Sequence, residues 1–508
     1  MRFVGKAEPF CKVCLAAQMT SCGVFMHWNF QQTYTQLPAA LFSSVLPASV
    51  PQPQSAVINH RLAAEMGLDP EALSASGGVA ELAGCVVPAG SEPIAQAYAG
   101  HQFGSFTILG DGRAIVLGEH VDSAGNRWDI QLKGSGITPY SRSGDGKAVL
   151  GPMLREYIIS EAMHALGIPT TRSLAVVTTG ETVWRETALP GAVLTRVAAS
   201  HIRVGTFQYA ASCNDSALLK TLADYTIQRH YPELAAAENP YLVFLEAVMQ
   251  RQVSLITAWM NVGFIHGVMN TDNMAVSGET IDYGPCAFMD RYDPKTVFSS
   301  IDMYGRYAFS NQPAIALWNL SRFAETLLPL IHDERPKAIE QAEEVLERFA
   351  TQFQESWGTA LRCKLGLGNK EEADAKLIEE LLTWMHKNRA DYINTFRVLM
   401  DAYDAPCGIF AHDQTFAPWW KAWAERRKRQ PQSDAETLQI MQRANPAVIP
   451  RNDRVEEALQ AASDGQDYKP LHALLDALQD SYDHQRERAY YQEPPPPDAP
   501  PYRTFCGT

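Results

Sequence analysis

The chain has 508 residues, of which 46% are hydrophobic and 20% are charged. This length and composition indicate an ordinary globular protein that buries a large core and forms about two or three domains. The formal net charge is −14, which argues against a nucleic-acid-binding protein, because such a protein needs a basic face to neutralise phosphates. A small basic pocket for one nucleotide remains compatible with this charge.

The sequence carries no clear targeting or membrane-spanning segment. No apolar run reaches the roughly 18 residues that a membrane-spanning helix needs, so we expect no membrane association. Residues 1–26 contain Lys6, Glu8 and Lys12 and lack a clean apolar core, which makes them a poor secretory signal. We predict that this N-terminal extension is disordered. Nine cysteines in so long a chain do not form a disulfide scaffold, and we expect a cytoplasmic protein.

Residues 93–200 are rich in predicted β-structure. Apolar residues at helical spacing predict one helix over 153–166, which follows Pro152 and ends at Gly167. The preceding residues, 27–92, are mixed in character and are treated as a separate N-terminal segment. Short apolar runs bounded by Gly, Asp and Asn predict strands, including 114–117, 128–132, 173–179 and 193–197.

The second half of the chain has a mainly helical pattern. It spans residues 201–492, with a long helical region at 312–485 and one interrupting loop at 262–290. Residues 493–508 form a stiff, proline-rich arm and a short tail that contains a cysteine. A β-rich lobe followed by a helical lobe is the arrangement of the protein kinases. We therefore predict an α+β, bilobal protein-kinase-like fold with a β-rich N-lobe and an enlarged helical C-lobe.

The stretch from Gly263 to Gly284 says most about function. It contains Gly263-Phe-Ile-His-Gly-Val-Met-Asn-Thr-Asp-Asn273 and then Ile281-Asp-Tyr-Gly284, which have the shape of a kinase catalytic loop and a metal-binding Asp-Tyr-Gly. A kinase loop reads His-Arg-Asp, four residues, then Asn, and its Asp serves as the base. Aligning His266 and Asn273 on this pattern puts Val268 at the base position, and valine accepts neither a proton nor a hydrogen bond.

The same stretch still points to phosphate chemistry. Asn273 and Asp282 supply hard oxygen ligands suited to Mg²⁺ or Mn²⁺, and a carboxylate is present at Asp272, directly before Asn273. His266 is more typical of a structural residue in such a loop than of a catalytic one. The chain is therefore either an inactive relative of the kinases or an enzyme with different phosphate chemistry.

A lysine and a glutamate upstream match the kinase device that positions the nucleotide. Lys133 ends the run Asp129-Ile-Gln-Leu-Lys133, and Glu156 lies in the first turn of the next predicted helix. In kinases a strand lysine pairs with a helix glutamate in this way. The alternatives are a solvated lysine at a strand end and a glutamate that only favours the start of a helix.

Glycine-rich segments lie on both sides of this lysine. Leu109-Gly-Asp-Gly-Arg113, preceded by Gly100-His-Gln-Phe-Gly104, lets backbone N–H groups approach phosphate closely, although a tight hairpin turn without a ligand explains it equally well. Loops as long as residues 134–147 are usually functional or disordered. Within this loop, Asp145 and Gly146 offer a carboxylate and a flexible backbone near the predicted nucleotide.

Two arginines follow in sequence. Arg196 lies inside an apolar strand-like run, where it is costly unless it is paired, and Arg203 comes shortly after it. Guanidinium groups match phosphate oxygens in a bidentate manner. A structural ion pair is the alternative interpretation.

Together these segments resemble the selenoprotein O family (SelO, also described as the YdiU family) over about residues 27–508. The resemblance implies a pseudokinase fold that binds ATP in a flipped orientation and transfers AMP, not phosphate, to Ser, Thr or Tyr hydroxyls of proteins. For bacterial members it also implies UMP transfer from UTP. The matching motifs are Tyr98-Ala-Gly-His-Gln-Phe-Gly104, Leu109-Gly-Asp-Gly-Arg113, Gln131-Leu-Lys-Gly-Ser-Gly136, Thr138-Pro-Tyr-Ser-Arg142, Leu154-Arg-Glu-Tyr157, Gly263 to Asp290, Asn445-Pro, and Pro450-Arg-Asn452.

The same resemblance implies a role in catalysis, metal binding or nucleotide binding for several of these residues. Asp272 would be the catalytic base, Asn273 and Asp282 would bind Mg²⁺ or Mn²⁺, and Glu156 would orient Lys133. A flipped nucleotide presents its α-phosphorus to the acceptor hydroxyl, so the base must move with it, and metal and arginines would stabilise the developing charge. The residues expected to bind the nucleotide are Gly110, Gly112, Arg113, Lys133, Asp145, Gly146, Arg196, Arg203 and Asp282.

The resemblance also implies a redox-active residue near the C-terminus, where other members carry selenocysteine and this chain has Cys506. Cys286, in Gly284-Pro-Cys-Ala-Phe288, lies in the activation-segment position. We hypothesise that Cys286 and Cys506 form a redox-switched disulfide, with the proline-rich arm giving reach; in a cytosol this would be regulatory. Two unrelated free thiols are the alternative.

We therefore predict a protein adenylyltransferase whose partners are ATP and hydroxyl-bearing proteins, with no nucleic-acid partner. A kinase-like γ-phosphotransferase with Asp272 as an unusual base is the alternative enzyme. An inert nucleotide-binding scaffold is the alternative outside the enzymes, and the intact set of Lys133, Asn273 and Asp282 argues against it.

Overall fold

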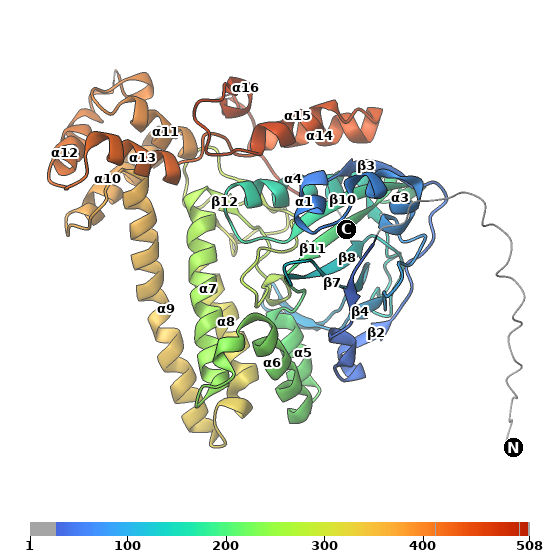
Figure 1. Cartoon of the computed structure of the whole chain (residues 1–508). Coiled ribbons are helices and arrows are strands. Elements are labelled where there is room, and N and C mark those ends of the chain that lie inside the picture. Colours follow the sequence, from blue (N-terminus) through green and yellow to red (C-terminus); the bar gives the residue numbers. More distant parts are fainter. Residues whose placement is uncertain (1–26, 412, 497, 506–508) are drawn as a thin grey trace, which may run out of the picture.

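The computed structural model describes residues 27–411, 413–496 and 498–505. The predicted extension of residues 1–26 and the tail cysteine Cys506 lie outside these ranges. Within them the chain is a mixed α/β protein, with a large antiparallel sheet in the first part and a mainly helical second part (Figure 1). No helix in these ranges is both long enough and apolar enough to cross a lipid bilayer.

One nine-stranded sheet organises the first part of the chain. Its strand order is β2-β4-β7-β8-β11-β10-β3, and in addition β1 pairs with β7 and β9 with β11. The four predicted strand regions are confirmed and extend further than predicted, and residues 27–92 contribute three strands that were not predicted. The strands are β1 (Phe30–Gln31), β2 (Phe42–Ser44), β3 (Gln54–Ile58), β4 (Ile94–Gln96), β7 (Ala114–Val121), β8 (Arg127–Lys133), β9 (Ala148–Val149), β10 (Arg172–Trp184) and β11 (Ala188–Ala198).

One face of the sheet is covered by helix α4 (Leu150–Ala165), which packs on β10 and β11. Its Leu154 joins Val176 of β10 in the larger apolar core. The helix begins at Leu150, before the predicted start, because Pro152 is tolerated in the first turn, where backbone N–H groups have no intrahelical partner. Glu156 therefore lies in the second turn of this helix and not, as predicted, in the first.

The opposite face of the sheet is covered by short helices from the N-terminal segment. A second apolar core joins Leu62 and Leu73 of these helices to Ile130 and Leu132 of β8. Side chains alternate along a strand, so the neighbours of Ile130 and Leu132 on β8 point toward α4. The helices are α1 (His60–Glu65), α2 (Pro70–Ser74) and α3 (Ser76–Leu82).

The second part of the chain is helical, as predicted. The long helices α7, α8 and α9 pack against one another, and α14 and α15 return to pack on α4 beside the sheet (Figure 1). Helices α10 to α13 form a separate group at the other end of the molecule (Figure 1). The helices are α5 (Val204–Ser212), α6 (Ser216–His230), α7 (Pro240–Asn261), α8 (Gln312–Ile331), α9 (Arg335–Lys364), α10 (Asp374–Asn388), α11 (Tyr392–Asp401), α12 (Ala417–Arg427), α13 (Asp434–Ala444), α14 (Asn452–Gly465), α15 (Lys469–Leu478) and α16 (Ala489–Gln492).

Two small hairpins complete the fold. Strands β5 (Ala99–Gln102) and β6 (Ser105–Ile108) form one of them, and the short strands β12 (Phe264–Ile265) and β13 (Ala287–Phe288) form the other. The β12–β13 pair joins the two ends of the segment from residue 266 to residue 286, which contains most of the kinase-like stretch.

Candidate active site

A cavity of about 410 Å³ brings together the segments that the sequence singled out. Seven Lys and Arg residues but only four Asp residues line it, in a chain with a net charge of −14. This local excess of positive charge favours a compact anion such as a polyphosphate, and the volume is typical of small-molecule sites. The cations are Arg113, Lys133, Arg142, Lys147, Arg185, Arg196 and Arg203; the carboxylates are Asp111, Asp145, Asp272 and Asp282.

Strand β8 and helix α4 supply a buried ion pair at the back of the cavity. Lys133 Nζ donates to Glu156 Oε2 at 2.6 Å, which confirms the predicted pair. The second oxygen of Glu156 accepts from Arg196 Nη1 at 3.1 Å. The Glu156 side chain is only 2% exposed, and it therefore fixes the position of two cations at once.

Asp282 lies where three cations converge. Its Oδ1 accepts from Lys133 Nζ at 3.2 Å and from Arg196 Nη1 at 2.5 Å, and its Oδ2 accepts from Arg203 Nη1 at 2.5 Å. Burial by itself would raise the pKa of Asp282, but the charges of Arg203, Arg196 and Lys133 hold this pKa well below its usual value. These three cations therefore favour the ionised form of Asp282 on the cavity wall.

Asp272 lies in a short 3₁₀ turn, Thr271–Asn273, of the loop that follows β12. Its backbone carbonyl accepts from Arg203 Nη1 at 2.7 Å. Its Oδ1 packs so closely on Gly100 of β5 that a Cβ at Gly100 would lie only 2.1 Å away. Burial raises the pKa of Asp272 to about 6, against the opposing charge of Arg203. This carboxylate can take up or release a proton near neutral pH.

Asn273 and Asp282, the two residues predicted to bind a metal, both line the cavity. Asn273 Nδ2 donates to the Val268 carbonyl at 3.0 Å, which leaves its Oδ1 as the atom able to bind a cation. The described ranges hold no cluster of three or more His, Cys, Asp or Glu side chains that could bind a metal by itself. Mg²⁺ is often held by one or two protein oxygens together with substrate phosphates, so this sparse donor set suits Mg²⁺ or Mn²⁺ in the presence of a nucleotide.

The segment 109–113, between β6 and β7, lines the cavity and packs against residues 138–141. Gly110 has φ +128°, and a Cβ at this position would lie 2.4 Å from the Tyr140 ring. Thr138 Oγ1 donates to the Asp111 carbonyl at 2.6 Å. Close packing against Tyr140 therefore requires a glycine at position 110. The segment 109–113 is not itself a tight hairpin turn; the nearby hairpin turn lies between β5 and β6.

The loop 134–147 forms a rim of the same cavity. Asp145 accepts from Arg185 Nη1 at 2.8 Å and from the Lys147 backbone N–H at 3.0 Å. Gly146 has φ +69°, and a Cβ there would lie 2.2 Å from the backbone of Gly136. The loop is thus folded tightly on itself, with charged side chains at its edge.

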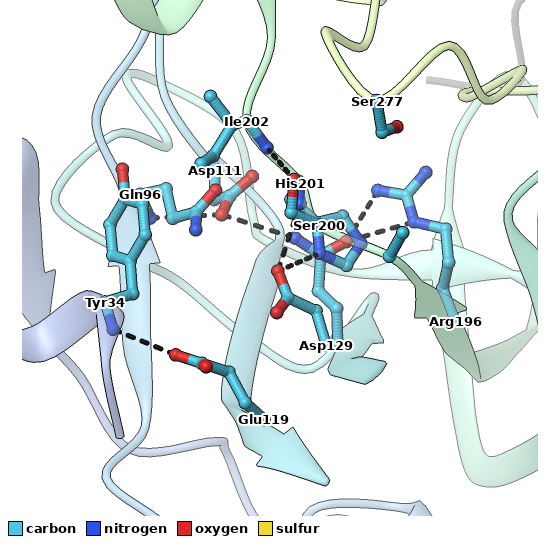
Figure 2. A network of polar contacts seen from close by, with 12 residues as sticks. Tyr34, Gln96, Asp111, Glu119, Asp129, Arg196, Ser200, His201, Ile202 and Ser277 are labelled. Carbon is cyan, nitrogen blue, oxygen red and sulfur yellow. Dashed lines mark hydrogen bonds and ion pairs between the residues drawn. The ribbon is translucent and has the colours of Figure 1, made fainter. Parts of the chain in front are cut away.

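A buried polar network underlies the cavity (Figure 2). Gln131 connects two cavity residues: its Oε1 accepts from Arg196 Nη2 at 2.5 Å, and its Nε2 donates to Asp111 Oδ2 at 3.3 Å. In Figure 2 the buried Asp129 also accepts from the backbone N–H of His201, at 3.0 Å. Burial lowers the pKa of His201 to about 4, so this histidine is neutral. The network fixes the guanidinium of Arg196 from behind.

The comparison with known proteins decides the family. The SelO family, described as protein adenylyltransferase SelO, matches residues 24–479. A relative from Bacillus cytotoxicus named protein nucleotidyltransferase YdiU is 58% identical over 481 residues, which cover 95% of this chain and 98% of the relative. Relatives of the same name from Brevibacillus brevis and Halalkalibacterium halodurans are 59% and 58% identical, again over 95% of this chain and 98% of the relative.

The chain belongs to the SelO family. In this member of the SelO family, the predicted nucleotide, base and metal residues all line the single cavity described above, from Gly110 to Asp282. Glu156 lies behind Lys133, in contact with it. His266 is fully buried, and its Nε2 lies 3.0 Å from the Ile281 carbonyl, which agrees with the structural role expected for it.

The structure adds cavity residues that sequence reasoning did not select. Arg142, Lys147 and Arg185 line the cavity, and the Arg203 guanidinium lies 4.7 Å from the centre of the Tyr98 ring. Arg142 and Lys147 belong to the loop 134–147, whose length indicated either a functional or a disordered segment, so their charge was a usable signal. Arg185 lies at a hairpin turn 40 residues from its partner Asp145, and no sequence pattern predicts that contact.

The structure leaves the proposed disulfide untested. Cys286 is buried, whereas Cys506 lies outside the described residues. The last described part of the tail does reach this region, since Thr504 Oγ1 donates to the carbonyl of Pro285 at 2.8 Å. The pairing of Cys286 with Cys506 stays a prediction.

Proposed function

We propose that this chain transfers AMP from ATP to Ser, Thr or Tyr hydroxyls of proteins and releases pyrophosphate, with UMP transfer from UTP as an alternative reaction of the same site. Family membership supports this proposal. The observation that carries it is the position of Asp272, a carboxylate with a pKa of about 6, in the same cavity as the phosphate-binding cations. Val268, at the kinase base position, lines that cavity but has no proton acceptor in its side chain.

The arrangement of elements supports a bilobal, kinase-like interpretation of the fold. The sheet with α4 corresponds to an N-lobe, and the helices from α5 onward correspond to a C-lobe. The buried pair of Lys133 and Glu156 joins a strand to a helix, as in kinases. Asn273 and Asp282 lie on the segments expected of kinase metal ligands.

In the proposed site, Lys133, Arg196 and Arg203 bind the phosphates of the nucleotide. Arginines held rigidly by Glu156 and Asp282 need little reorganisation when charge develops on the α-phosphate and on pyrophosphate, which lowers the activation free energy. The glycine segment around Gly110, with Arg113, and the rim formed by Asp145 and Gly146 complete the nucleotide site.

Asp272 acts as the general base. It accepts the proton of the acceptor hydroxyl while that oxygen forms a bond to the α-phosphorus. The bond between the α-phosphorus and the bridging oxygen of the β-phosphate breaks, and pyrophosphate leaves with that electron pair. A pKa near the working pH suits this role, because the carboxylate is mostly ionised and still binds a proton. When bound, Mg²⁺ or Mn²⁺ would neutralise phosphate charge from Asn273 and Asp282.

The reaction is tested with ATP labelled at either the α- or the γ-phosphate, incubated with the reduced protein, Mg²⁺ or Mn²⁺ and a cell lysate. Label from the α-position alone, lost in Asp282→Ala, is expected. Label from the γ-position alone would establish the kinase alternative. Nucleotide binding without label from either position would favour the inert scaffold, or an acceptor protein that the lysate lacks. We also propose that the protein is cytoplasmic, which cell fractionation would test. The proposed disulfide between Cys286 and Cys506 would be tested separately by thiol mapping.

A further inference from the structure

The β5–β6 hairpin stands directly beside the proposed base. Its two-residue turn is Phe103-Gly104, with φ values of +50° and +90°, as in the tight turns that suit a twisted hairpin. The loop that carries Asp272 binds the outer edge of β5: Thr271 Oγ1 accepts from the His101 N–H at 2.7 Å, and Asn270 Oδ1 accepts from the Phe103 N–H at 3.1 Å. The hairpin is therefore fixed to the active site along one edge.

The outer edge of β6 is open. Leu109 N donates to the Tyr98 carbonyl at 2.9 Å, and the register continues through Gly100 opposite Thr107. Hydrogen-bonded and non-bonded pairs alternate in an antiparallel ladder, so the N–H and C=O groups of Phe106 and Ile108 point away from β5. Among the described residues, β5 is the only strand that pairs with β6.

The same edge exposes apolar side chains. Phe106 is 47% exposed and Ile108 is 57% exposed, and the hairpin contains no Lys, Arg, Asp, Glu or Pro. Natural proteins usually protect an edge strand with charge, proline or a covering element. At the turn, Phe103 is 39% exposed, and its ring lies 5.2 Å from the ring of the buried Tyr307.

The two faces of the hairpin have different surroundings. On one face, the Cβ direction of Gly100 meets Asp272, and Gln102 lines the cavity. On the other face, Phe106 packs at 5.3 Å from the His101 ring. Side chains alternate along a strand, so a strand added at the edge of β6 would present one side chain to the face of Asp272 and both of its neighbours to the apolar face.

We propose that the acceptor protein docks as an extended segment on the outer edge of β6, with its hydroxyl residue opposite Thr107. The residues directly before and after that hydroxyl residue lie beside Phe106 and Ile108 and are apolar. The backbone groups of Phe106 and Ile108 supply the hydrogen bonds, as in other proteins that bind peptides by adding a strand to a sheet. This proposal rests on the proposed transferase function and names its substrate class: extended segments with an apolar residue on each side of the hydroxyl.

Two synthetic peptides test this proposal. Both peptides have the same central hydroxyl residue, either tyrosine or serine. In the valine peptide this residue has a valine on each side, and in the aspartate peptide it has an aspartate on each side. Binding is followed by fluorescence anisotropy with the whole protein, and modification is followed with α-labelled ATP. We expect at least roughly tenfold tighter binding and a correspondingly lower KM for the valine peptide, which corresponds to the contribution of a few buried interface side chains. Equal binding of both peptides, or no binding of either, would overturn the docking proposal.

Matched variants locate the surface. Phe106→Ala combined with Ile108→Ala is expected to weaken valine-peptide binding roughly tenfold while the Kd for ATP stays unchanged. Ile108→Pro should weaken binding further than Ile108→Ala, because it also removes the outward N–H of residue 108. Ile409→Ala, at a side chain 51% exposed in the distant helical group, is the control and should bind as the wild type does. Wild-type binding by the Phe106 and Ile108 variants would refute the assignment.

The readouts separate the two proposals. Peptide binding does not depend on chemistry, so preferred binding of the valine peptide without any α-label would leave the docking surface in place and overturn the transferase. Labelling of lysate proteins that is unaffected by the Phe106 and Ile108 variants would support the transferase and overturn the docking surface.

Discussion

The contact between Gly100 and Asp272 allows a sharp test of the site. A Cβ at Gly100 would lie 2.1 Å from Oδ1, 2.7 Å from Cγ and 2.8 Å from Cβ of Asp272. The φ angle of Gly100 is outside the left-handed region, so alanine suits the backbone, and the three atoms nearest to its Cβ all belong to Asp272. Gly100→Ala is therefore a direct perturbation of the proposed base from the neighbouring strand.

The expected size of the effect of Gly100→Ala on catalysis follows from the close packing around Asp272. The residue is 6% exposed, and its carbonyl is held by Arg203. Heavy atoms cannot approach one another this closely, so the Asp272 carboxylate must move about 1 Å away from the Cβ that Gly100→Ala introduces. A displacement of this size in a catalytic group lowers kcat roughly 100-fold. Overpacking should also lower the free energy of unfolding by about 1–3 kcal/mol. The Kd for ATP should change little, because Lys133 and Arg196, which are proposed to bind phosphate, are held by Glu156 and Asp282 and not by Asp272.

The assay is incorporation of α-label as a function of acceptor and ATP concentration, together with urea unfolding and ATP binding. Gly465→Ala is the matched control, since a Cβ there meets nothing within 4 Å and alanine should favour the helix by up to about 1 kcal/mol. A folded Gly100→Ala protein with wild-type kcat would refute the reasoning that Asp272 must keep its present position.

Three further predictions concern charge. Burial raises the pKa of Asp272 to about 6, so kcat/KM should rise as pH increases through about 6 and then level off; a flat profile from about pH 5 to pH 8 would contradict the base assignment. Glu156→Gln should lower kcat/KM for ATP by roughly 10- to 100-fold and the free energy of unfolding by up to about 3 kcal/mol, because Lys133 loses its charged partner at 2.6 Å and keeps only Asp282. An unchanged kcat/KM for ATP would show that Lys133 needs no orienting group. Burial lowers the pKa of Lys364 to about 7, so between about pH 7 and 10 the folded state binds fewer protons than the unfolded chain, and the free energy of unfolding should fall as the pH drops through this range. Lys364→Met should make the free energy of unfolding, measured by urea unfolding at several pH values, less dependent on pH. The same pH dependence in the variant and the wild type would contradict this prediction.

Much of the architecture follows from local pattern. The strand at Lys133, the helix that carries Glu156 and the helices after residue 312 were predicted correctly, because alternation and helical spacing in the sequence reflect burial against a core. The boundaries were less accurate: α4 begins at Leu150 because a proline is acceptable in a first turn. The strands of residues 27–58 were missed because their short pairings depend on partners elsewhere in the sheet.

The sequence by itself determined the chemistry of the site: the lysine, the arginines, the carboxylates at 272 and 282 and the absence of a base at Val268. The tertiary structure decided how these groups are connected. Three cations converge on Asp282, Gly100 presses on Asp272, and β6 keeps an open edge beside them. These features depend on distances between segments far apart in the chain, and they set the pKa values and the pairing of strand edges, which residue identity and spacing alone do not specify.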